Sequence, residues 1–458
     1  MERIRTLAAE RVNEAIRTDP VKRYGRVVRS SGDVLRASGI RAPIGARCLI
    51  DTEGGQAIAA EVVGFEEGSL LIMPEQGTRG VVRGARVHAE NRAPAPLMGP
   101  AHFGRVIDGR GLPLDSKVPP NVAHPWPLMG VPINPMLRER IAVPFDVGVS
   151  AINALATLGR GMRVGLFAGS GVGKTTLLGM MARHAKADIA VVGMIGERGR
   201  EIREFVEDHL GAAKPRSVVV ASPADETALG RVHGAYLAAA IAEYWRDQGK
   251  QVLLVVDSLT RLAMALREIG LAIGEPPATK GYPPSVFARL PQLVERAGNS
   301  DRGVGSITAF YTVLVEGDDQ NDPIADAARA ILDGHFVLSR RLAESGLYPA
   351  LDIEASISRA MHQISTREHL ELATRFKQVY STYQQNRDLI AVGAYRRGSD
   401  PRVDVAIDHW PKILDFLRQD MYEPISIEQS FADLRQLVTQ FSAPPAPQAA
   451  PPPAHAVR

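Results

Sequence analysis

The pattern of apolar and polar positions first predicts a helix at the start of the chain. Residues 3–16 place apolar side chains at helical spacing between arginines and glutamates. Such a helix either covers its own domain or docks onto a partner, because terminal segments are often loosely attached. The spacing leaves both open, and we treat residues 1–20 as an amphipathic partner-docking helix.

Short alternating runs follow from about Tyr24 to Pro94, broken by Gly, Asp and Ser turns. Alternation of apolar and polar residues is typical of half-buried antiparallel strands. We therefore expect a small antiparallel β-barrel over residues 21–95. Proline-rich stretches then predict extended connecting chain, namely APAPLMGP and KVPPNVAHPWPLMGVPINP.

Between Val143 and about Gln363 the pattern changes to continuous apolar runs separated by long amphipathic stretches. Runs of this kind are typical of parallel strands that helices bury on both faces. We therefore expect an α/β domain over residues 96–365. The predicted strands are MRVGLFA, ADIAVVGMIG, SVVVAS, QVLLVVDS, SITAFYTVLV and HFVLS.

Helical patterns replace the strands after Thr366, and the clearest are REHLELATRFKQVYSTYQQNRDL and WPKILDFL. They predict a C-terminal helical domain over residues 366–441. Residues 442–458 are rich in proline and alanine and cannot bury a core, so we expect a disordered tail. A chain of 458 residues is also too long for one ordinary core, which agrees with several domains.

Composition narrows the class of protein. Apolar residues make up 45% and charged residues 23%, and the net charge of +3 is too small to indicate a nucleic-acid-binding surface. Cys48 is the only cysteine, so we expect no disulfide and a reducing cytoplasm. Neither a secretory signal nor a bilayer-length apolar run is present, so we expect only peripheral membrane association.

The segment AGSGVGKT follows the run MRVGLF and precedes a helical stretch, which is the context of a P-loop. Its glycines let backbone N–H groups converge on phosphate oxygens at a helix N-terminus. We expect Lys174 to bridge the β- and γ-phosphates, Thr175 to ligate Mg²⁺, and Thr176 to lie near the α-phosphate. The expected ATP contacts are Ala168, which replaces the usual glycine, Gly169, Ser170, Gly171, Val172, Gly173, Lys174, Thr175 and Thr176.

Hydrolysis also needs carboxylates at neighbouring strand ends. Asp257 ends the run QVLLVV and is expected to hold the magnesium shell, although it could instead cap a helix. Glu197 follows the run IAVVGMIG and could polarise the attacking water. An ion pair of Glu197 with Arg200 or Arg203 is an equally good interpretation of the residues alone.

Five segments together resemble the flagellar protein export ATPases: AGSGVGKTTLL, GERGREIREFVED, VVDSLTRLAMALREIGLAIGEPP, ATKGYPPSVFARLPQLVERAG and LDIEASISRAM. The resemblance covers about Tyr24 to Phe441. It extends to the rotary ATP synthase catalytic subunits and the virulence type III secretion ATPases, and the flagellar branch rests chiefly on ATKGYPPSVF and DIEASISRAM. It implies an α/β fold, a RecA-like P-loop ATPase core between the small N-terminal antiparallel β-barrel and the C-terminal helical domain.

The resemblance also implies roles for residues that bind and cleave ATP. Glu197 matches the catalytic glutamate, with Arg198 beside it, and Asp257 matches the magnesium-shell aspartate. Arg261 matches an arginine that faces the γ-phosphate. Arg359 matches the arginine finger, which acts on the neighbouring subunit of a ring. The alternative for Arg359 is a structural ion pair with Glu354 or Asp352.

Two further positions are implied for the adenine. Tyr348 matches the aromatic residue that stacks on the base, although it could instead belong to the core. Met421 lies where the rotary catalytic subunit has a second aromatic wall.

The implied function is Mg-ATP hydrolysis by a homo-oligomeric ring, a hexamer, that powers flagellar type III protein export at the cytoplasmic face of the inner membrane. Implied partners are a regulator on the N-terminal helix, a stalk protein and chaperone–substrate complexes. A virulence secretion ATPase remains the first alternative. A non-catalytic ring subunit is disfavoured because such subunits carry Gln near the position of Glu197. An RNA-dependent helicase is disfavoured because Tyr24 and Phe65 are the only aromatics in residues 24–94.

Overall fold

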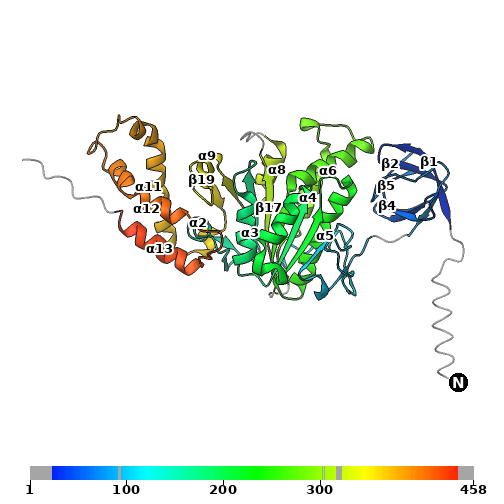
Figure 1. Cartoon of the computed structure of the whole chain (residues 1–458), viewed down its shortest axis with the longest axis horizontal. Helices are drawn as coiled ribbons and strands as arrows, with labels where there is room; N and C mark the ends of the chain where they lie inside the picture. Colours follow the sequence, from blue (N-terminus) through cyan, green and yellow to red (C-terminus); the bar gives the residue numbers. More distant parts are fainter. Residues whose placement is uncertain (1–22, 91–93, 302, 304, 316–321, 442–458) are drawn as a thin grey trace, which may run out of the picture.

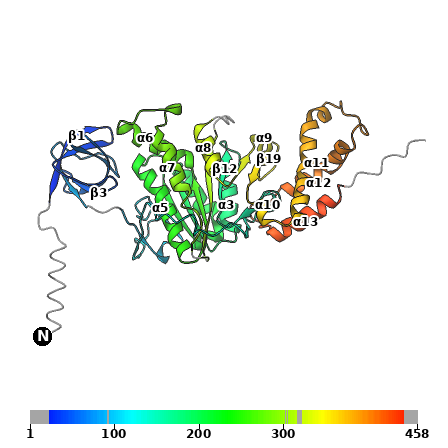
Figure 2. The ribbon, with the colours of Figure 1, turned by 180° about the vertical axis from the view of Figure 1, so that it is seen from behind.

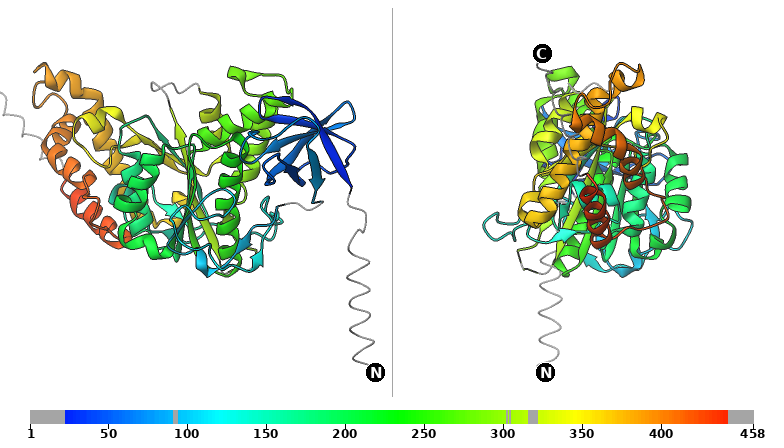
Figure 3. Two further views of the ribbon diagram at one scale, coloured as in Figure 1. Left: turned by 45° about the vertical axis from the view of Figure 1, so that its right-hand side comes forward. Right: turned by 90° about the vertical axis from the view of Figure 1, so that its left-hand side faces the viewer.

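The computed structural model describes residues 23–90, 94–301, 303, 305–315 and 322–441. The predicted N-terminal helix, residues 1–20, and the predicted tail, residues 442–458, lie outside the described residues. Three parts follow one another in a row, with a barrel at one end and helices at the other (Figures 1 and 2). The oblique view keeps the same order (Figure 3, left). The predicted fold class is confirmed.

The N-terminal part is a closed antiparallel barrel with the strand order β1-β2-β5-β4-β3-β6. Alternate residues of its strands point inward, and Leu35, Cys48 and Ile72 are among the buried ones. Closure removes exposed strand edges, which otherwise pair with other chains. The strands are β1 (Tyr24–Ser31), β2 (Val34–Ser38), β3 (Arg47–Asp51), β4 (Ala57–Glu66), β5 (Ser69–Pro74) and β6 (Arg86–Ala89).

The central part is built on a large sheet with the order β19-β18-β12-β17-β15-β13-β14-β8. Its strands pair in parallel, except that β19 runs antiparallel to β18, and β16 pairs antiparallel with β17. The strands are β8 (Arg105–Ile107), β12 (Arg163–Ala168), β13 (Ile189–Ile195), β14 (Ser217–Ser222), β15 (Gln251–Asp257), β16 (Gly298–Asn299), β17 (Ser306–Leu314), β18 (Gly334–Leu338) and β19 (Leu351–Ser358).

All six predicted apolar runs form parallel strands, but the sheet is wider than predicted. The edge strands β8 and β19 were not expected. β19 alternates buried and exposed residues because it lies at an edge, so it lacks the continuous apolar pattern of the inner strands. β8 has only three residues, too few to show a pattern.

Helices bury both faces of the sheet. Alternate residues of β13 enter different cores: Val191 packs with α5, and Val192 packs with α3. This double burial explains the continuous apolar runs. The helices of the central part are α2 (Ser150–Leu155), α3 (Lys174–His184), α4 (Gly199–Glu204), α5 (Ala228–Asp247), α6 (Leu259–Ala272), α7 (Pro284–Val294), α8 (Pro323–Ile331), α9 (Arg340–Glu344) and α10 (Met361–Ile364).

Polar contacts join the outer parts to the centre. On the barrel side, Glu61 lies 2.7 Å from the ring nitrogen Nε2 of His233, and the Thr227 hydroxyl donates to the carbonyl of Glu75 at 2.8 Å. On the helical side, Nε2 of His369 lies 2.7 Å from the carbonyl of Ala154. The C-terminal helices are α11 (Arg367–Ala391), α12 (Pro401–Leu417) and α13 (Ile427–Thr439). Among the helices described, none has the length and apolarity that crossing a bilayer would require.

Candidate active site

The predicted P-loop joins β12 to α3. Ala168 is the last residue of β12, and Lys174 is the first residue of α3. Gly171 has φ +77°, which favours glycine, and a side chain there would meet nothing within 4 Å. Gly173 precedes the helix, and no side chain caps its first N–H groups. The loop therefore offers backbone donors at a helix N-terminus, the arrangement that suits phosphate.

Lys174 lies between two carboxylates at the carboxyl edge of the sheet. Its Nζ donates to Oδ1 of Asp257 at 2.6 Å and lies 3.5 Å from Oε1 of Glu197. Asp257 ends β15, and Glu197 comes two residues after β13, the neighbouring strand. Both carboxylates are buried, at 2% and 7% exposure. The three predicted side chains therefore meet at one point.

Burial and the three charges shift the pKa values of the cluster. Burial and the nearby charge of Asp257 raise the pKa of Glu197 to about 7, although Lys174 opposes the shift. Burial by itself lowers the pKa of Lys174, but the charges of Asp257 and Glu197 outweigh it and raise that pKa. Lys174 therefore stays charged at neutral pH, while Glu197 can exchange a proton there.

The geometry also decides between the alternative interpretations of the two carboxylates. Arg200 lies 3.2 Å from Glu204 and Arg203 lies 3.0 Å from Glu207, whereas Glu197 faces Lys174. The ion pair of Glu197 with Arg200 or Arg203 is therefore not formed.

The cap of α6 is likewise not the aspartate. Ser258 caps this helix, because its hydroxyl accepts a hydrogen bond from the N–H of Arg261 at 3.2 Å. The helix-cap interpretation of Asp257 is therefore wrong, and its carboxylate is left to face Lys174.

Two predicted arginines differ in their relation to this cluster. Arg261 packs against Gly196, where an added Cβ would lie 2.9 Å from the Cβ of Arg261. Its buried Nε has no hydrogen-bond partner among the described residues. Its Nη1 donates to Sδ of Met264 at 3.7 Å, so the Nε–H is the donor left for an incoming anion. Arg198 is exposed and lies 3.8 Å from Glu201, so the structure leaves it outside the cluster.

Tyr348 lies against the P-loop rather than in the core. Its side chain is exposed, and a Cβ on Gly173 would lie 3.3 Å from its ring. Its carbonyl accepts from the N–H of Gln419 at 3.0 Å. Two residues further on, the carbonyl of Met421 accepts from Arg183 at 2.5 Å. The loop that carries Met421 is thereby held beside both Tyr348 and the end of α3.

Arg359 lies at the opposite edge of the sheet from the P-loop. It follows β19, whose Ser358 pairs with Gly334, and Gly334 pairs with Val164 near the start of β12. The P-loop follows the other end of β12, about 17 Å away at about 3.3 Å per residue. The exposed guanidinium of Arg359 donates to the carbonyl of Arg329 at 3.2 Å.

The carboxylates proposed as structural partners of Arg359 are engaged elsewhere. Asp352 accepts from the N–H groups of Glu354 and Ala355, each at 3.0 Å. Glu354 accepts from the Ser381 hydroxyl at 2.6 Å. Within the described ranges Arg359 forms no ion pair with either carboxylate, so the structural ion-pair interpretation of Arg359 is wrong.

Two side chains at the site escaped the sequence analysis. The Thr312 hydroxyl donates to Oδ1 of Asp257 at 2.6 Å, and Nη2 of Arg340 donates to the Ser170 carbonyl at 3.3 Å. Thr312 is a polar residue near the end of a predicted apolar strand, which was an available signal. Arg340 had no such signal, because only the fold brings the start of α9 to the P-loop.

The donor set fits magnesium bound together with a nucleotide. Across the described parts of the chain, no three His, Cys, Asp or Glu side chains gather to hold a metal unaided. Magnesium commonly takes one or two protein oxygens and completes its shell with phosphates and water. The Thr175 hydroxyl beside the P-loop and the buried Asp257 carboxylate suit that role.

Comparison with known proteins agrees with this geometry. Residues 27–90 match the ATP synthase alpha/beta family β-barrel domain, residues 148–358 its nucleotide-binding domain, and residues 365–436 the T3SS EscN ATPase C-terminal domain. The flagellum-specific ATP synthase of Salmonella typhimurium is 56% identical over 425 residues, which cover 90% of this chain and 93% of the relative. The chain belongs to the type III export ATPases.

Type III secretion ATPases of pathogenic bacteria are also similar to this type III export ATPase. The type 3 secretion system ATPase of Xanthomonas euvesicatoria is 47% identical, over 87% of this chain and 90% of the relative. The assembled ATPase EscN of enteropathogenic E. coli is 44% identical with a TM-score of 0.85, over 90% of this chain and all of that one. EscN in complex with its central stalk EscO gives 42% and 0.83, with the same coverage. These relatives establish ATPase activity coupled to type III protein export.

Proposed function

We propose that this type III export ATPase hydrolyses Mg-ATP as a homohexameric ring that powers flagellar protein export. The observation that carries the proposal is the meeting of Lys174, Asp257 and Glu197 beside the P-loop, with Arg359 on the opposite edge of the same sheet. Each subunit thus carries a nucleotide site at one edge and an exposed arginine at the other.

In this proposal, residues 168–176 bind the triphosphate through backbone N–H groups, and Lys174 exchanges its carboxylate partners for phosphate oxygens. Bound Mg²⁺, held by Thr175 and Asp257, would neutralise phosphate charge. Tyr348 stacks on the adenine beside Gly173, and Met421 contributes the second wall. Arg340 braces the loop through the Ser170 carbonyl.

For the chemical step, Glu197 accepts a hydrogen bond from the attacking water and orients it toward the γ-phosphate. Its raised pKa places its proton exchange near neutral pH, where a general base is most effective. Arg261 donates its unpartnered N–H to the developing charge on the γ-phosphate. Arg359 of the adjacent subunit stabilises the transition state.

Assembly in a ring follows from the two edges. Because Arg359 lies about 17 Å along the sheet from its own P-loop, it can complete only a neighbour's site. Such contacts between unlike faces generate a ring when the rotation closes. EscN, a relative whose assembled form and stalk complex are known, supports an oligomer with a stalk protein for this chain.

The flagellar assignment is supported by two flagellum-specific ATP synthases of 56% identity, while others of that name range down to 44% and the virulence relative has 47%. We propose export chaperone–substrate complexes and a regulator on residues 1–20 as further partners, at the cytoplasmic face of the inner membrane. Deletion of the gene should abolish flagellar filaments. Loss of effector delivery with normal filaments would assign the chain to virulence secretion instead.

The proposed units are residues 1–20, 21–95, 96–365, 366–441 and 442–458. The family matches at 27–90, 148–358 and 365–436 support the three inner ones.

The decisive test of the mechanism is Glu197→Gln. Nucleotide affinity should stay within about twofold, and turnover should fall about 100-fold to 10,000-fold, the usual contribution of a positioned general base. Glu204→Gln is the matched control, because Glu204 lies on the adjacent helix and pairs with Arg200 at the surface. Normal phosphate release by the Glu197 variant would remove Glu197 from its role.

A further inference from the structure

We propose that Asp333 is a positioning residue, which fixes the direction in which Arg359 leaves its own subunit toward the neighbour's active site. The inference rests on the proposed function of Arg359 in trans. Among the described residues the Asp333 side chain contacts Arg163 and not the P-loop, and the family resemblance implies no role for it. Its place in the sheet nevertheless connects the P-loop strand to the arginine.

Asp333 forms hydrogen bonds with two residues, Arg163 and Arg359. Its carboxylate Oδ2 accepts from the backbone N–H of Arg163 at 2.9 Å and from Nε of Arg163 at 3.1 Å. Its own N–H donates to the carbonyl of Arg163 at 2.8 Å. Its carbonyl accepts from the backbone N–H of Arg359 at 3.1 Å. The peptide of Asp333 is therefore held by Arg163 on one side and holds Arg359 on the other.

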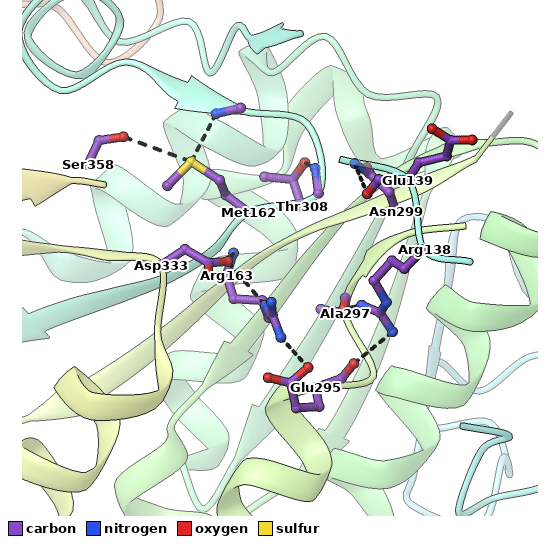
Figure 4. Close-up of polar contacts among 12 residues, drawn as sticks. Arg138, Glu139, Met162, Arg163, Glu295, Ala297, Asn299, Thr308, Asp333 and Ser358 are labelled. Atoms are coloured by element: carbon purple, nitrogen blue, oxygen red, sulfur yellow. Dashed lines mark hydrogen bonds and ion pairs between the residues drawn. The ribbon is translucent and has the colours of Figure 1, made fainter. Parts of the chain in front are cut away.

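Arg163 is a firm support for Asp333. Its side chain is 15% exposed and lies between the carboxylates of Asp333 and Glu295, which is 2.5 Å from Nη1 (Figure 4). Glu295 is mostly exposed, so its ion pair contributes little, whereas Asp333 is only 27% exposed. Asp333 is thus the main partner that keeps the Arg163 side chain in place.

The side chain of Arg359 has little support of its own. Its guanidinium is exposed and, within the described part of the chain, makes one hydrogen bond, to the Arg329 carbonyl. Its backbone anchor on Asp333 therefore sets its direction. A finger must arrive within a fraction of an ångström of its target to stabilise a transition state, and a misplacement of 1 Å can cost about 100-fold in rate.

The chain contains a matched control for this motif. Asp188 precedes β13 and makes the same exchange with Gln251, the first residue of β15: its carboxylate accepts the Gln251 N–H at 2.8 Å, and its own N–H donates to the Gln251 carbonyl at 2.8 Å. Each aspartate precedes one strand and bonds to the first residue of the adjacent parallel strand, at the same edge of the sheet. Only Asp333 also holds Arg359.

The first measurement compares Asp333→Asn with Asp188→Asn in the full-length oligomer. Asp333→Asn should lower kcat about 10-fold to 100-fold and change the KM for ATP less than about threefold, because its own P-loop is intact. Asp188→Asn removes the equivalent carboxylate charge at the matching position and should keep both constants near wild type. An unchanged kcat for Asp333→Asn would overturn the inference.

The second measurement asks where the defect acts. Subunits carrying Asp333→Asn are assembled in equal amounts with subunits carrying Glu197→Gln. The latter have an inactive nucleotide site but a correctly placed Arg359. Activity should recover to about one quarter of wild type, because about one site in four pairs an intact P-loop with an intact finger. A Glu197→Gln and Arg359→Ala mixture, tested in parallel, should recover equally.

The two mixtures separate the possible failures. Recovery with Arg359→Ala but not with Asp333→Asn would show that Asp333 acts on its own subunit, which overturns the inference and leaves the proposed function standing. No recovery in either mixture would overturn the action of Arg359 in trans, and the inference with it. If Asp333→Asn does not assemble, Arg163→Lys takes its place in both measurements, since it removes the Nε contact and keeps the backbone bonds.

Discussion

The amino group of Lys174 donates a hydrogen bond to Asp257, with 2.6 Å between Nζ and Oδ1. The lysine proposed for phosphate and the carboxylate proposed for magnesium therefore bind each other. Mg-ATP must replace this pair with two new contacts when it enters. Removing one member of a buried pair leaves the other charge uncompensated, so variants of the two residues should differ in their effects.

Replacing Asp257 with asparagine should separate nucleotide binding from magnesium binding. If Asp257 holds the metal shell, as proposed, wild-type protein should bind ATP more tightly with Mg²⁺ than without it. In Asp257→Asn this gain should fall at least about 10-fold, while Mg²⁺-free ATP should bind as well as before or better, because Lys174 is released. Titration of a fluorescent ATP analogue with and without Mg²⁺ measures both affinities. An undiminished magnesium effect would exclude Asp257 from the metal shell.

The buried carboxylate of Glu197 should cost stability at neutral and alkaline pH. Its pKa is about 7 in the folded chain and near 4.5 when unfolded, so between these values the folded state binds a proton that the unfolded state has released. This contribution to stability is complete below pH 4.5 and is lost as the pH rises through 7. Glu197→Gln, which cannot ionise, should therefore be more stable than wild type at pH 8 by up to about 3 kcal/mol, and similar at pH 5.

Urea unfolding of both proteins without nucleotide, at several pH values, measures this difference in the free energy of unfolding. Glu204→Gln is the control, because Glu204 is half exposed and pairs with Arg200 on the surface of α4. A constant difference between wild type and Glu197→Gln from pH 5 to 8 would contradict the raised pKa.

Arg261 should contribute to turnover more than to stability. Its buried Nε lacks a partner among the described residues, so Arg261→Met removes no hydrogen bond of that nitrogen. We expect the melting temperature to change little and kcat to fall about 10-fold to 100-fold, because the γ-phosphate loses a cationic donor. Arg267→Met on the same helix is the control, since Arg267 stacks on the ring of Tyr282 at 4.9 Å. Equal turnover in the two variants would place Arg261 outside the reaction.

Tyr348 should act through its ring and not through its hydroxyl. Its side chain is 45% exposed beside Gly173, a position suited to stacking on a base. Tyr348→Phe should keep the KM for ATP, and Tyr348→Ala should raise it about 10-fold, since base stacking on an aromatic contributes about 1–3 kcal/mol. The KM is measured from the release of inorganic phosphate, with ATP and with GTP as substrates. A KM increase in the phenylalanine variant would indicate a hydrogen bond instead.

Local patterns in the sequence were sufficient for the inner sheet and the P-loop. The six buried strands have continuous apolar runs, and the phosphate loop is a contiguous segment, so neither depends on distant residues. The hydroxyl of Thr312 in an apolar strand was a signal in the sequence, but its partner could not be predicted from it. Asp257 comes beside Thr312 only because β17 pairs with β15.

Tertiary contacts decide the remaining part of the site. The family resemblance gave both Arg261 and Arg198 a place at the site, but Arg261 packs against Gly196 while Arg198 is exposed to solvent. Arg340 and Asp333 show no local signal at all. Each contacts a residue more than a hundred positions away in the chain: Arg340 bonds to Ser170, and Asp333 bonds to Arg163.

If, as proposed, Arg359 completes only a neighbour's site, its position across the sheet from the P-loop has an arithmetic consequence for assembly. In an open row of subunits the last P-loop faces no arginine, so a row of n subunits holds n − 1 complete sites, and joining the two ends supplies the missing one. The lone subunit has none. Nucleotide turnover per subunit therefore increases with the number of subunits in the row and again when the ring closes. Hydrolysis is then available for export only where subunits have already assembled.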